Sequence, residues 1–373
     1  MLTVKREEKK VEYLELIYDL IFVYIIGRNN SLLHSVQNGF ISGAQFAAYV
    51  LSTLAAIQIW NYSTFYINMF GRNGVRDHVF LFVNMYLLYY IGEGTRLHWQ
   101  GFWTQYHVAW ALILANIGTQ YLIELRNHRA APEAERTIRG MLIALFGEAA
   151  LVLLATPADR GGFPFVTTAA ILYGVGVTMR FSDERKAGLV DFTHLSERAM
   201  LYVVFTFGEM IIGIASYFEG ALTLNSVYFS LMAFLIVAAL FLSYEVLYNR
   251  IIDRGMTTAG MTYMLIHIFL IFAMNNLTTA LDFMQNAAVS LWPKTLFLVG
   301  AFLLFYLCML ALMRYARRDM GLCPRFLVPV AAMTLAFVVG MLLLRERMAL
   351  NIALSVVYVY GMFIRILLFS RHI

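Results

Sequence analysis

Two glutamates, Glu148 and Glu209, each end a Phe-Gly-Glu tripeptide inside a long apolar stretch of this 373-residue chain. The stretches read IRGMLIALFGEAALVLLAT and LSERAMLYVVFTFGEMIIGIASYF, and each is long enough to cross a bilayer. A carboxylate at such a depth costs about 3 kcal/mol on insertion scales unless it is protonated, paired or facing water. Two deep carboxylates in matching contexts therefore indicate a functional site.

A cluster of polar residues precedes Glu209 in the run DFTHLSERAM. His194 and Glu197 are three residues apart and Arg198 follows, so on a helix His194 shares a face with both. Because histidine titrates near neutral pH, this pattern favours a proton relay or a substrate entry. A structural N-cap with a salt bridge is an equally open interpretation. A metal is a third possibility, but His-x-x-Glu supplies only two ligands and other helices would have to add more, so no residue is assigned as a metal ligand.

The first apolar stretch also contains acids. Glu15 and Asp19 are one helical turn apart and share a face, with Glu12 nearby. At 1.5 Å per residue from the flanking charges, Asp19 lies about 13 Å, and Glu148 and Glu209 about 18 Å, into the bilayer. Three acids on three helices thus have similar depths near the midplane. Interhelical hydrogen bonds that hold a bundle together are the alternative explanation.

The rest of the chain must position these groups in a membrane. Hydrophobic residues make up 61% of it and charged residues 14%, whereas soluble proteins have about 25% charged residues. We predict an all-α, polytopic integral membrane bundle with about 12 transmembrane helices. The predicted spans are roughly 13–30, 44–66, 78–95, 103–124, 138–156, 163–181, 195–218, 225–248, 260–283, 293–314, 325–344 and 347–368.

The basic residues orient this bundle. With a cytoplasmic N-terminus, 22 of the 28 lysines and arginines fall inside and 6 outside, as the positive-inside rule requires. We therefore predict that both termini are cytoplasmic. The chain is interpreted as a single transmembrane domain, 1–373, with two six-helix halves at about 1–189 and 190–373 and no soluble domain.

Several other residues are explained by structural roles. Aromatic residues near the ends of spans predict an interfacial belt: Trp60, Tyr62, Tyr66, Trp99, Trp103, Tyr106 and Trp292. The lone histidines His107 and His267 are interpreted as satisfied core residues. The basic loops follow from topology and form no single patch, so we predict no nucleic-acid partner.

Two motifs resemble a known family. The opening run VEYLELIYDLIFV and the later run HLSER with its following FGE resemble the signatures of the bacterial low-temperature-requirement protein A family. The chain departs from them at LIY, where paired phenylalanines are usual, and at Phe207, where leucine is usual. The resemblance implies a multi-pass protein of the bacterial inner membrane, and it maps the signature acids onto Glu15, Asp19, Glu197 and Glu209. It implies no particular chemistry.

Deep carboxylates on parallel helices predict a proton-coupled transporter or permease of a small solute. The predicted substrate and proton pathway comprises Glu15, Asp19, Glu148, His194, Glu197, Arg198 and Glu209. Two alternatives stay open, a membrane-embedded enzyme acting on lipid or another apolar substrate, and a non-catalytic scaffold or accessory subunit of a membrane complex. The expected partners are the lipid bilayer and either protons or a small solute. A homo-oligomer or a complex partner stays open, and the substrate, the coupling ion and any cofactor stay unidentified.

Overall fold

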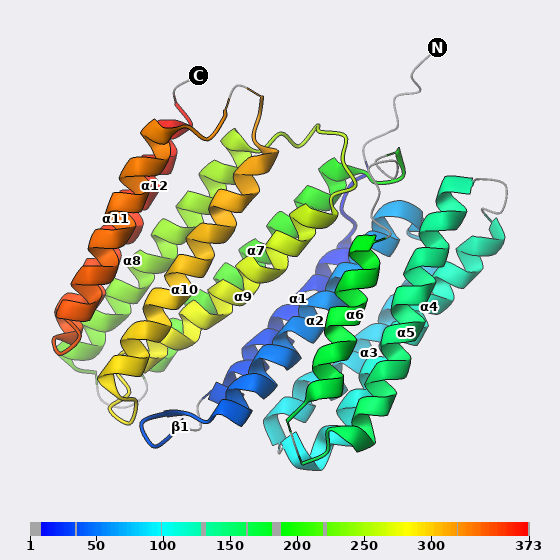
Figure 1. The fold of residues 1–373 in the computed structure, drawn as a ribbon, viewed down its shortest axis with the longest axis horizontal. Helices are drawn as coiled ribbons and strands as arrows, with labels where there is room; N and C mark the ends of the chain where they lie inside the picture. Colours follow the sequence, from blue (N-terminus) through cyan, green and yellow to red (C-terminus); the bar gives the residue numbers. More distant parts are fainter. Residues whose placement is uncertain are drawn as a thin grey trace. The chain divides into compact units, whose positions relative to one another are not determined.

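The computed structural model describes residues 9–33, 36–97, 99–127, 132–161, 163–180, 188–218, 222–318 and 320–371. These residues form twelve α-helices joined by short connections (Figure 1). The helices are α1 (Tyr13–Asn29), α2 (Gly43–Phe70), α3 (Val75–Leu97), α4 (Trp99–Asn127), α5 (Pro132–Ala158), α6 (Phe165–Arg180), α7 (Phe192–Gly213), α8 (Leu224–Val246), α9 (Met261–Phe283), α10 (Leu291–Leu312), α11 (Pro324–Leu343) and α12 (Met348–Phe369). A small antiparallel hairpin pairs β1 (Val36–Gln37) with β2 (Phe40–Ile41).

Each predicted span coincides with one helix, which confirms the all-α fold. Apolar runs fold this way because a helix satisfies every backbone polar group within its own segment. The tight break predicted near Glu346 is also confirmed, since α11 ends at Leu343 and α12 begins at Met348. The helices extend furthest past the predicted spans in α4 and α5, which begin and end with more polar residues than their middles contain.

Eight helices in the described ranges are long and apolar enough to cross a membrane: α4, α5, α7, α8, α9, α10, α11 and α12. The apolar helix α6 has 16 residues and α1 has 17, while α2 and α3 have 28 and 23 residues but are not among these eight. The structure therefore has the helices of a multi-pass membrane protein. The count of twelve crossings and the cytoplasmic position of both termini stay predictions.

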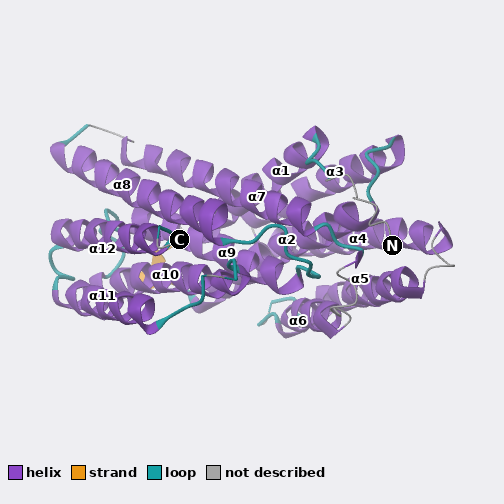
Figure 2. Ribbon diagram, turned by 90° about the horizontal axis from the view of Figure 1, so that it is seen from above, coloured by secondary structure: helices purple, strands orange, loops and turns teal. Residues whose placement is uncertain are grey.

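The chain divides into two compact units, and the first contains the residues discussed below. It comprises Met1–Ser35, Gly43–Tyr202 and Arg254–Met264. Within it α1 packs on α2 and α3, α3 on α4, α4 on α5, and α5 on α6. Figure 2 shows α4 between α3 and α5. This packing brings one face each of α2, α5 and α6 together.

The second unit comprises Val36–Ser42, Val203–Asp253 and Leu265–Ile373. In it α12 packs between α8 and α11 (Figure 2). The Phe337 and Tyr358 rings stack there at 4.1 Å between centroids. The helix α7 contributes its first turns to the first unit and its remainder to the second. The predicted six-helix halves stay a prediction.

Helix α2 is the most buried element of the first unit. Between Ser52 and Asn68 every residue except Leu54 is buried. The predicted interfacial belt is therefore wrong for Trp60 and Tyr62, which are at most 1% exposed. Since α2 continues to Phe70, these rings lie well inside the helix instead of at its end. Tyr66, Trp103 and Tyr106 are buried as well, Trp292 is exposed, and the side chain of Trp99 lies outside the described residues.

Candidate functional site

A buried ion cluster joins α1 to α7. It consists of Glu15, Asp19, His194 and Arg198, all at most 3% exposed. The Arg198 guanidinium forms ion pairs with Glu15 and Asp19, and its Nε donates a hydrogen bond to Asp19 Oδ2 at 3.1 Å. Arginine suits this position because its planar fork can bind carboxylates through two parallel hydrogen bonds. The helix face that Glu15 and Asp19 share is thus directed at the Arg198 guanidinium.

Helix α2 completes the shell around Asp19. The indole Nε1 of Trp60 donates a hydrogen bond to Asp19 Oδ1 at 2.8 Å, and the Trp60 ring lies 4.5 Å from the Tyr202 ring on α7. Tyr18, next to Asp19, shares a hydrogen bond of 2.7 Å with Ser63. Each Asp19 oxygen therefore accepts from a donor, which is what a buried carboxylate requires.

The tautomer of His194 is fixed by Asn68. The Asn68 amide donates to the carbonyl of Asp191 at 2.8 Å and accepts from its backbone N–H at 3.0 Å, so its orientation is set. Its NH₂ group lies 3.0 Å from His194 Nδ1, which must then be an acceptor. The proton of the neutral imidazole is thus on Nε2, 3.4 Å from Glu15 Oε2, within ion-pair distance but without a hydrogen bond.

Lys9 adds a second cation beside this cluster. Its ammonium donates to the carbonyls of Ile67 and of Gly71, the latter at 2.9 Å, and so caps the C-terminal end of α2. Burial lowers the pKa of Lys9, and the charge of Glu15 opposes that effect. A third carboxylate lies here as well, because the backbone N–H of Lys9 donates to Asp191 Oδ2 at 3.3 Å, so three carboxylates surround one guanidinium and one ammonium. The ion cluster therefore has the character of a framework that joins α1, α2 and α7.

A different arrangement surrounds Glu148 on α5. Its carboxyl group is completely buried. Oε2 accepts hydrogen bonds from the Tyr62 hydroxyl at 2.6 Å and from Gln58 Nε2 at 3.1 Å, and Gln58 also donates to Tyr62 at 2.7 Å. Oε1 has no hydrogen-bond partner, and no cation of the described residues pairs with Glu148. We call Glu148, Gln58 and Tyr62 the Glu148 site.

Gly174 on α6 makes this close approach possible. A Cβ at position 174 would come closer than 3.0 Å to Glu148 Oε2, Gln58 Nε2 and the Tyr62 hydroxyl. Any side chain there would displace the three polar groups from one another. The sequence GVG of α6 thus contributes a glycine whose absent side chain leaves room for a carboxyl group.

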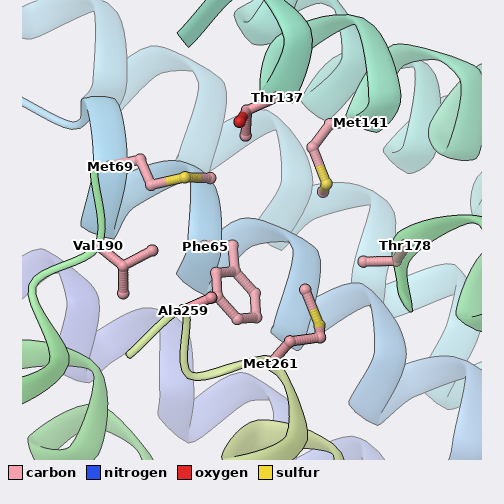
Figure 3. A pocket seen from close by; sticks show the side chains of 8 residues that line it. All are labelled: Phe65, Met69, Thr137, Met141, Thr178, Val190, Ala259 and Met261. Atoms are coloured by element: carbon pink, nitrogen blue, oxygen red, sulfur yellow. The ribbon is translucent and has the colours of Figure 1, made fainter. Parts of the chain in front are cut away.

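A pocket lies one to two helical turns from the Glu148 site, on the same helix faces. The pocket is small, with a cavity volume of about 20 Å³, which is enough for about one water molecule, and part of the space around it joins the solvent. It is lined by Phe65, Met69, Thr137, Met141, Thr178, Val190, Ala259 and Met261. Figure 3 shows the methionine side chains pointing toward the space around the Phe65 ring. Such a lining suits a small solute with apolar surface and few polar groups.

Sequence spacing connects the pocket to the Glu148 site. Phe65 is three residues beyond Tyr62, Met141 is seven residues before Glu148, and these intervals keep residues on one face of a helix. The Thr178 hydroxyl, which donates to the carbonyl of Gly174 at 2.6 Å, also lies near enough to the Tyr62 hydroxyl to interact with it. Polar groups therefore lead from the pocket to the carboxyl group.

The remaining predicted site residues lie elsewhere. Glu197 is half-buried and contacts no described residue by hydrogen bond or ion pair. Glu209 is half-buried on the part of α7 that belongs to the second unit. The two Phe-Gly-Glu copies also differ in packing, since a Cβ on Gly147 would meet Tyr173 whereas one on Gly208 would meet nothing within 4 Å. Similar tripeptides thus have dissimilar surroundings.

Sequence reasoning missed the α2 residues Gln58, Trp60, Tyr62 and Asn68. A signal was present, because the run IQIWNYSTFYIN places many hydrogen-bonding side chains in an uncharged helix. Such a run predicts a helix that is buried on all sides and contacts polar groups of its neighbours. Across the described ranges no group of three histidine, cysteine or acidic side chains is arranged to hold a metal ion.

Comparison with known proteins identifies a family. A family model described as the bacterial low temperature requirement A protein (LtrA) matches residues 10–361, nearly the whole chain. No curated protein matches the chain, and no solved structure matches it.

Proposed function

This chain belongs to the bacterial low temperature requirement A family, and we propose that it is a proton-coupled transporter of a small solute in the bacterial inner membrane. Glu148 is the group that binds and releases the proton. The pocket beside it receives the solute. The ion cluster holds α1, α2 and α7 in place around this pathway.

One observation carries the proposal: Glu148 is wholly buried, has one oxygen without a partner, and has no cation beside it in the described structure. An ionised carboxyl group in such surroundings costs several kcal/mol. A protonated one needs only its hydrogen bonds, and the two donors at Oε2 leave Oε1 able to hold the proton. The protonation state of Glu148 therefore depends on which groups and molecules lie next to its carboxyl group.

The contrast with Glu15 and Asp19 supports this choice of residue. Both of those acids pair with Arg198, so a proton would have to displace a guanidinium. An arginine partner favours the ionised form of a buried acid, whereas an acid without a cation can alternate between its two forms. Of the buried predicted acids, Glu148 thus suits proton exchange best.

The pocket explains how a solute would affect that proton. Thr178 lines the pocket and interacts with Tyr62, which donates to Glu148. A solute that turns the Tyr62 hydroxyl toward itself removes a donor from Oε2. Loss of that donor changes the free energy of the ionised carboxyl group relative to the protonated one. Solute binding and proton binding are then linked, as coupled transport requires.

The test uses purified protein in liposomes that contain a pH-sensitive dye. A low-molecular-weight fraction of bacterial extract is added outside, and the protein-dependent change in internal pH is recorded. Glu148→Gln should abolish the change, since glutamine accepts a hydrogen bond but exchanges no proton, whereas Glu148→Asp should retain part of it. Glu197→Gln is the matched control, because Glu197 is half-buried and has no described partner.

Folding is checked by the elution volume and the melting temperature of each variant in detergent. A folded Glu148→Gln protein with an unchanged pH response would refute the role of Glu148. Binding of a lipid or of another protein chain, together with a proton response that is absent even in the wild type, would favour the enzyme or the scaffold alternative.

A further inference from the structure

A second group of polar side chains occupies the opposite end of the same helix faces. It consists of His107 on α4, Asp159 just after α5, and Thr167 in the first turn of α6, all at most 4% exposed. We call it the His107 triad. On α5 the pocket residues lie in the first half, Glu148 lies in the middle, and Asp159 follows the last residue. The Glu148 site therefore lies between the pocket and the His107 triad.

Asp159 has an ordinary structural task, the capping of α6. Its Oδ1 accepts from the backbone N–H of Val166 at 3.0 Å and its Oδ2 from that of Thr167 at 2.7 Å. These are donors of the first helical turn, which lack partners within the helix. Capping explains Asp159 completely, but it explains neither the Thr167 hydroxyl nor the histidine beyond it.

The Thr167 hydroxyl has two neighbours and only one proton. It lies 2.8 Å from Asp159 Oδ2 and 3.2 Å from His107 Nε2. His107 Nδ1 lies 2.8 Å from the carbonyl of Trp103. Because a carbonyl only accepts, Nδ1 carries a proton in every arrangement. The state of Nε2 then depends on which neighbour receives the hydroxyl proton.

Two arrangements satisfy all these groups. If Thr167 donates to Asp159, Nε2 must donate to Thr167, and His107 is an imidazolium whose charge is balanced by Asp159 across one hydroxyl group. If Thr167 donates to Nε2, the imidazole is neutral and Asp159 keeps its two backbone donors. Gain of a proton at Nε2 and rotation of one hydroxyl group convert the second arrangement into the first, without movement of any heavy atom. If Thr167 donated to Asp159 while Nε2 carried no proton, a lone pair of Nε2 would face a lone pair of the Thr167 oxygen, which is unfavourable.

We infer that the His107 triad is a second proton-binding site, which loads protons for Glu148 from the side opposite the pocket. This role in loading rests on the proposed function of Glu148. Asp159 is the charged group that faces His107 in the described structure, together with the rings of Trp103, Tyr106 and Trp110. If the N-terminus is cytoplasmic, this end of the unit faces outward.

The path between the two sites is short and contains polar atoms. Thr167 and Gly174 are seven residues apart on α6, about 10 Å at 1.5 Å per residue. Gln58 connects this stretch to the Glu148 site, since it lies 3.4 Å from the carbonyl of Ile171 and donates to Glu148. Gln58 Oε1 and Trp110 Nε1 are buried and have no hydrogen-bond partner. Buried polar atoms of this kind are ones with which a water molecule can form a hydrogen bond.

The test measures the protonation of His107 directly. Protein labelled with ¹⁵N in histidine is placed in nanodiscs, and the signals of His107 are assigned by their loss in His107→Gln. The fraction with two N–H protons is followed against pH. Thr167→Val removes the hydroxyl group but keeps the backbone donor to Asp159, so it should shift the protonation equilibrium about tenfold toward neutral His107. Thr167→Ser should match the wild type.

The neighbouring residue supplies a matched control. Thr168 differs from Thr167 in its partner, because its hydroxyl donates to the carbonyl of Pro164 at 2.7 Å. Thr168→Val should therefore leave the His107 signals unchanged. The inference is overturned if Thr167→Val leaves the doubly protonated fraction unchanged, or if His107 stays neutral at every pH at which the protein is folded. Neither result depends on proton flux, so both are distinct from a failure of Glu148→Gln to abolish the pH response.

Discussion

Replacing Gly174 by alanine places a methyl group inside the Glu148 site. The added Cβ would lie closer than 3.0 Å to Glu148, Gln58 and Tyr62, a separation that real Cβ atoms essentially never show. All three side chains are buried, so they cannot all withdraw without breaking their hydrogen bonds. Overpacking costs about 1–3 kcal/mol, and a buried polar group that loses its partner costs about 1–3 kcal/mol. Gly174→Ala should therefore destabilise the protein by roughly 2–6 kcal/mol.

Gly176 provides a matched control on the same helix. It is exposed, and a Cβ there would meet nothing within 4 Å. Gly176→Ala should be neutral or stabilising by up to about 1 kcal/mol, because alanine favours a helix more than glycine does. Both proteins are compared with the wild type by thermal unfolding in detergent, followed by tryptophan fluorescence. The difference between the two variants reports on the Glu148 site alone.

A double variant refines this test. Glu148→Ala removes the carboxyl group that the new methyl group would meet first. The cost of Gly174→Ala should then fall by about 1 kcal/mol or more, since the two positions are in contact. The reasoning is refuted if Gly174→Ala unfolds at the wild-type temperature, or if its cost is the same with and without Glu148.

Three further predictions concern the ion cluster and its surroundings. Arg198→Met leaves Glu15 and Asp19 buried without a cation, so it should cost about 3–5 kcal/mol; full stability of this variant in thermal unfolding would contradict the framework role. Trp60→Phe keeps a ring in place but removes the donor to Asp19. Chemical denaturation should show that the free energy of unfolding falls by about 1.5–3 kcal/mol, and an unchanged free energy would contradict the role of Trp60. Burial lowers the pKa of Lys9, so the unfolded chain binds more protons than the folded one in the alkaline range below the ordinary lysine pKa. Stability should therefore rise with pH there in the wild type relative to Lys9→Met, and parallel curves of melting temperature against pH would contradict this.

The helices were predictable because their physical cause is local. Long apolar runs must satisfy their backbone polar groups internally, and this alone sets the helix positions. The shared face of Glu15 and Asp19 also follows from spacing along one helix. Both conclusions use only residues close together in the chain.

The partners of these residues could not be predicted in the same way. Arg198 is 179 residues from Asp19, and the rotation of each helix decides whether they meet. Periodicity resolves that rotation poorly when nearly every position is apolar. Spacing therefore grouped His194, Glu197 and Arg198 in one cluster, whereas the structure buries His194 and Arg198 against α1 and leaves Glu197 half-buried.

The same limit hid the contributions of α2. Its Gln58 and Tyr62 reach Glu148, and its Trp60 reaches Asp19. Aromatic residues near the end of a predicted span are typical of the membrane–water interface. The sequence alone therefore placed Trp60 and Tyr62 there, although such side chains also occur in the protein interior. Only the length of α2 and its contacts on several sides place these rings in the core.

Infrared spectroscopy tests the exchange of a proton by Glu148 most directly. Difference spectra of the protein in nanodiscs are recorded as the pH is lowered, and the C=O stretching band of a protonated carboxylic acid is followed. A band that appears on acidification, and is missing from a folded Glu148→Gln protein but present in Glu197→Gln, is the predicted result. An unchanged band in Glu148→Gln would contradict the assignment of proton exchange to Glu148.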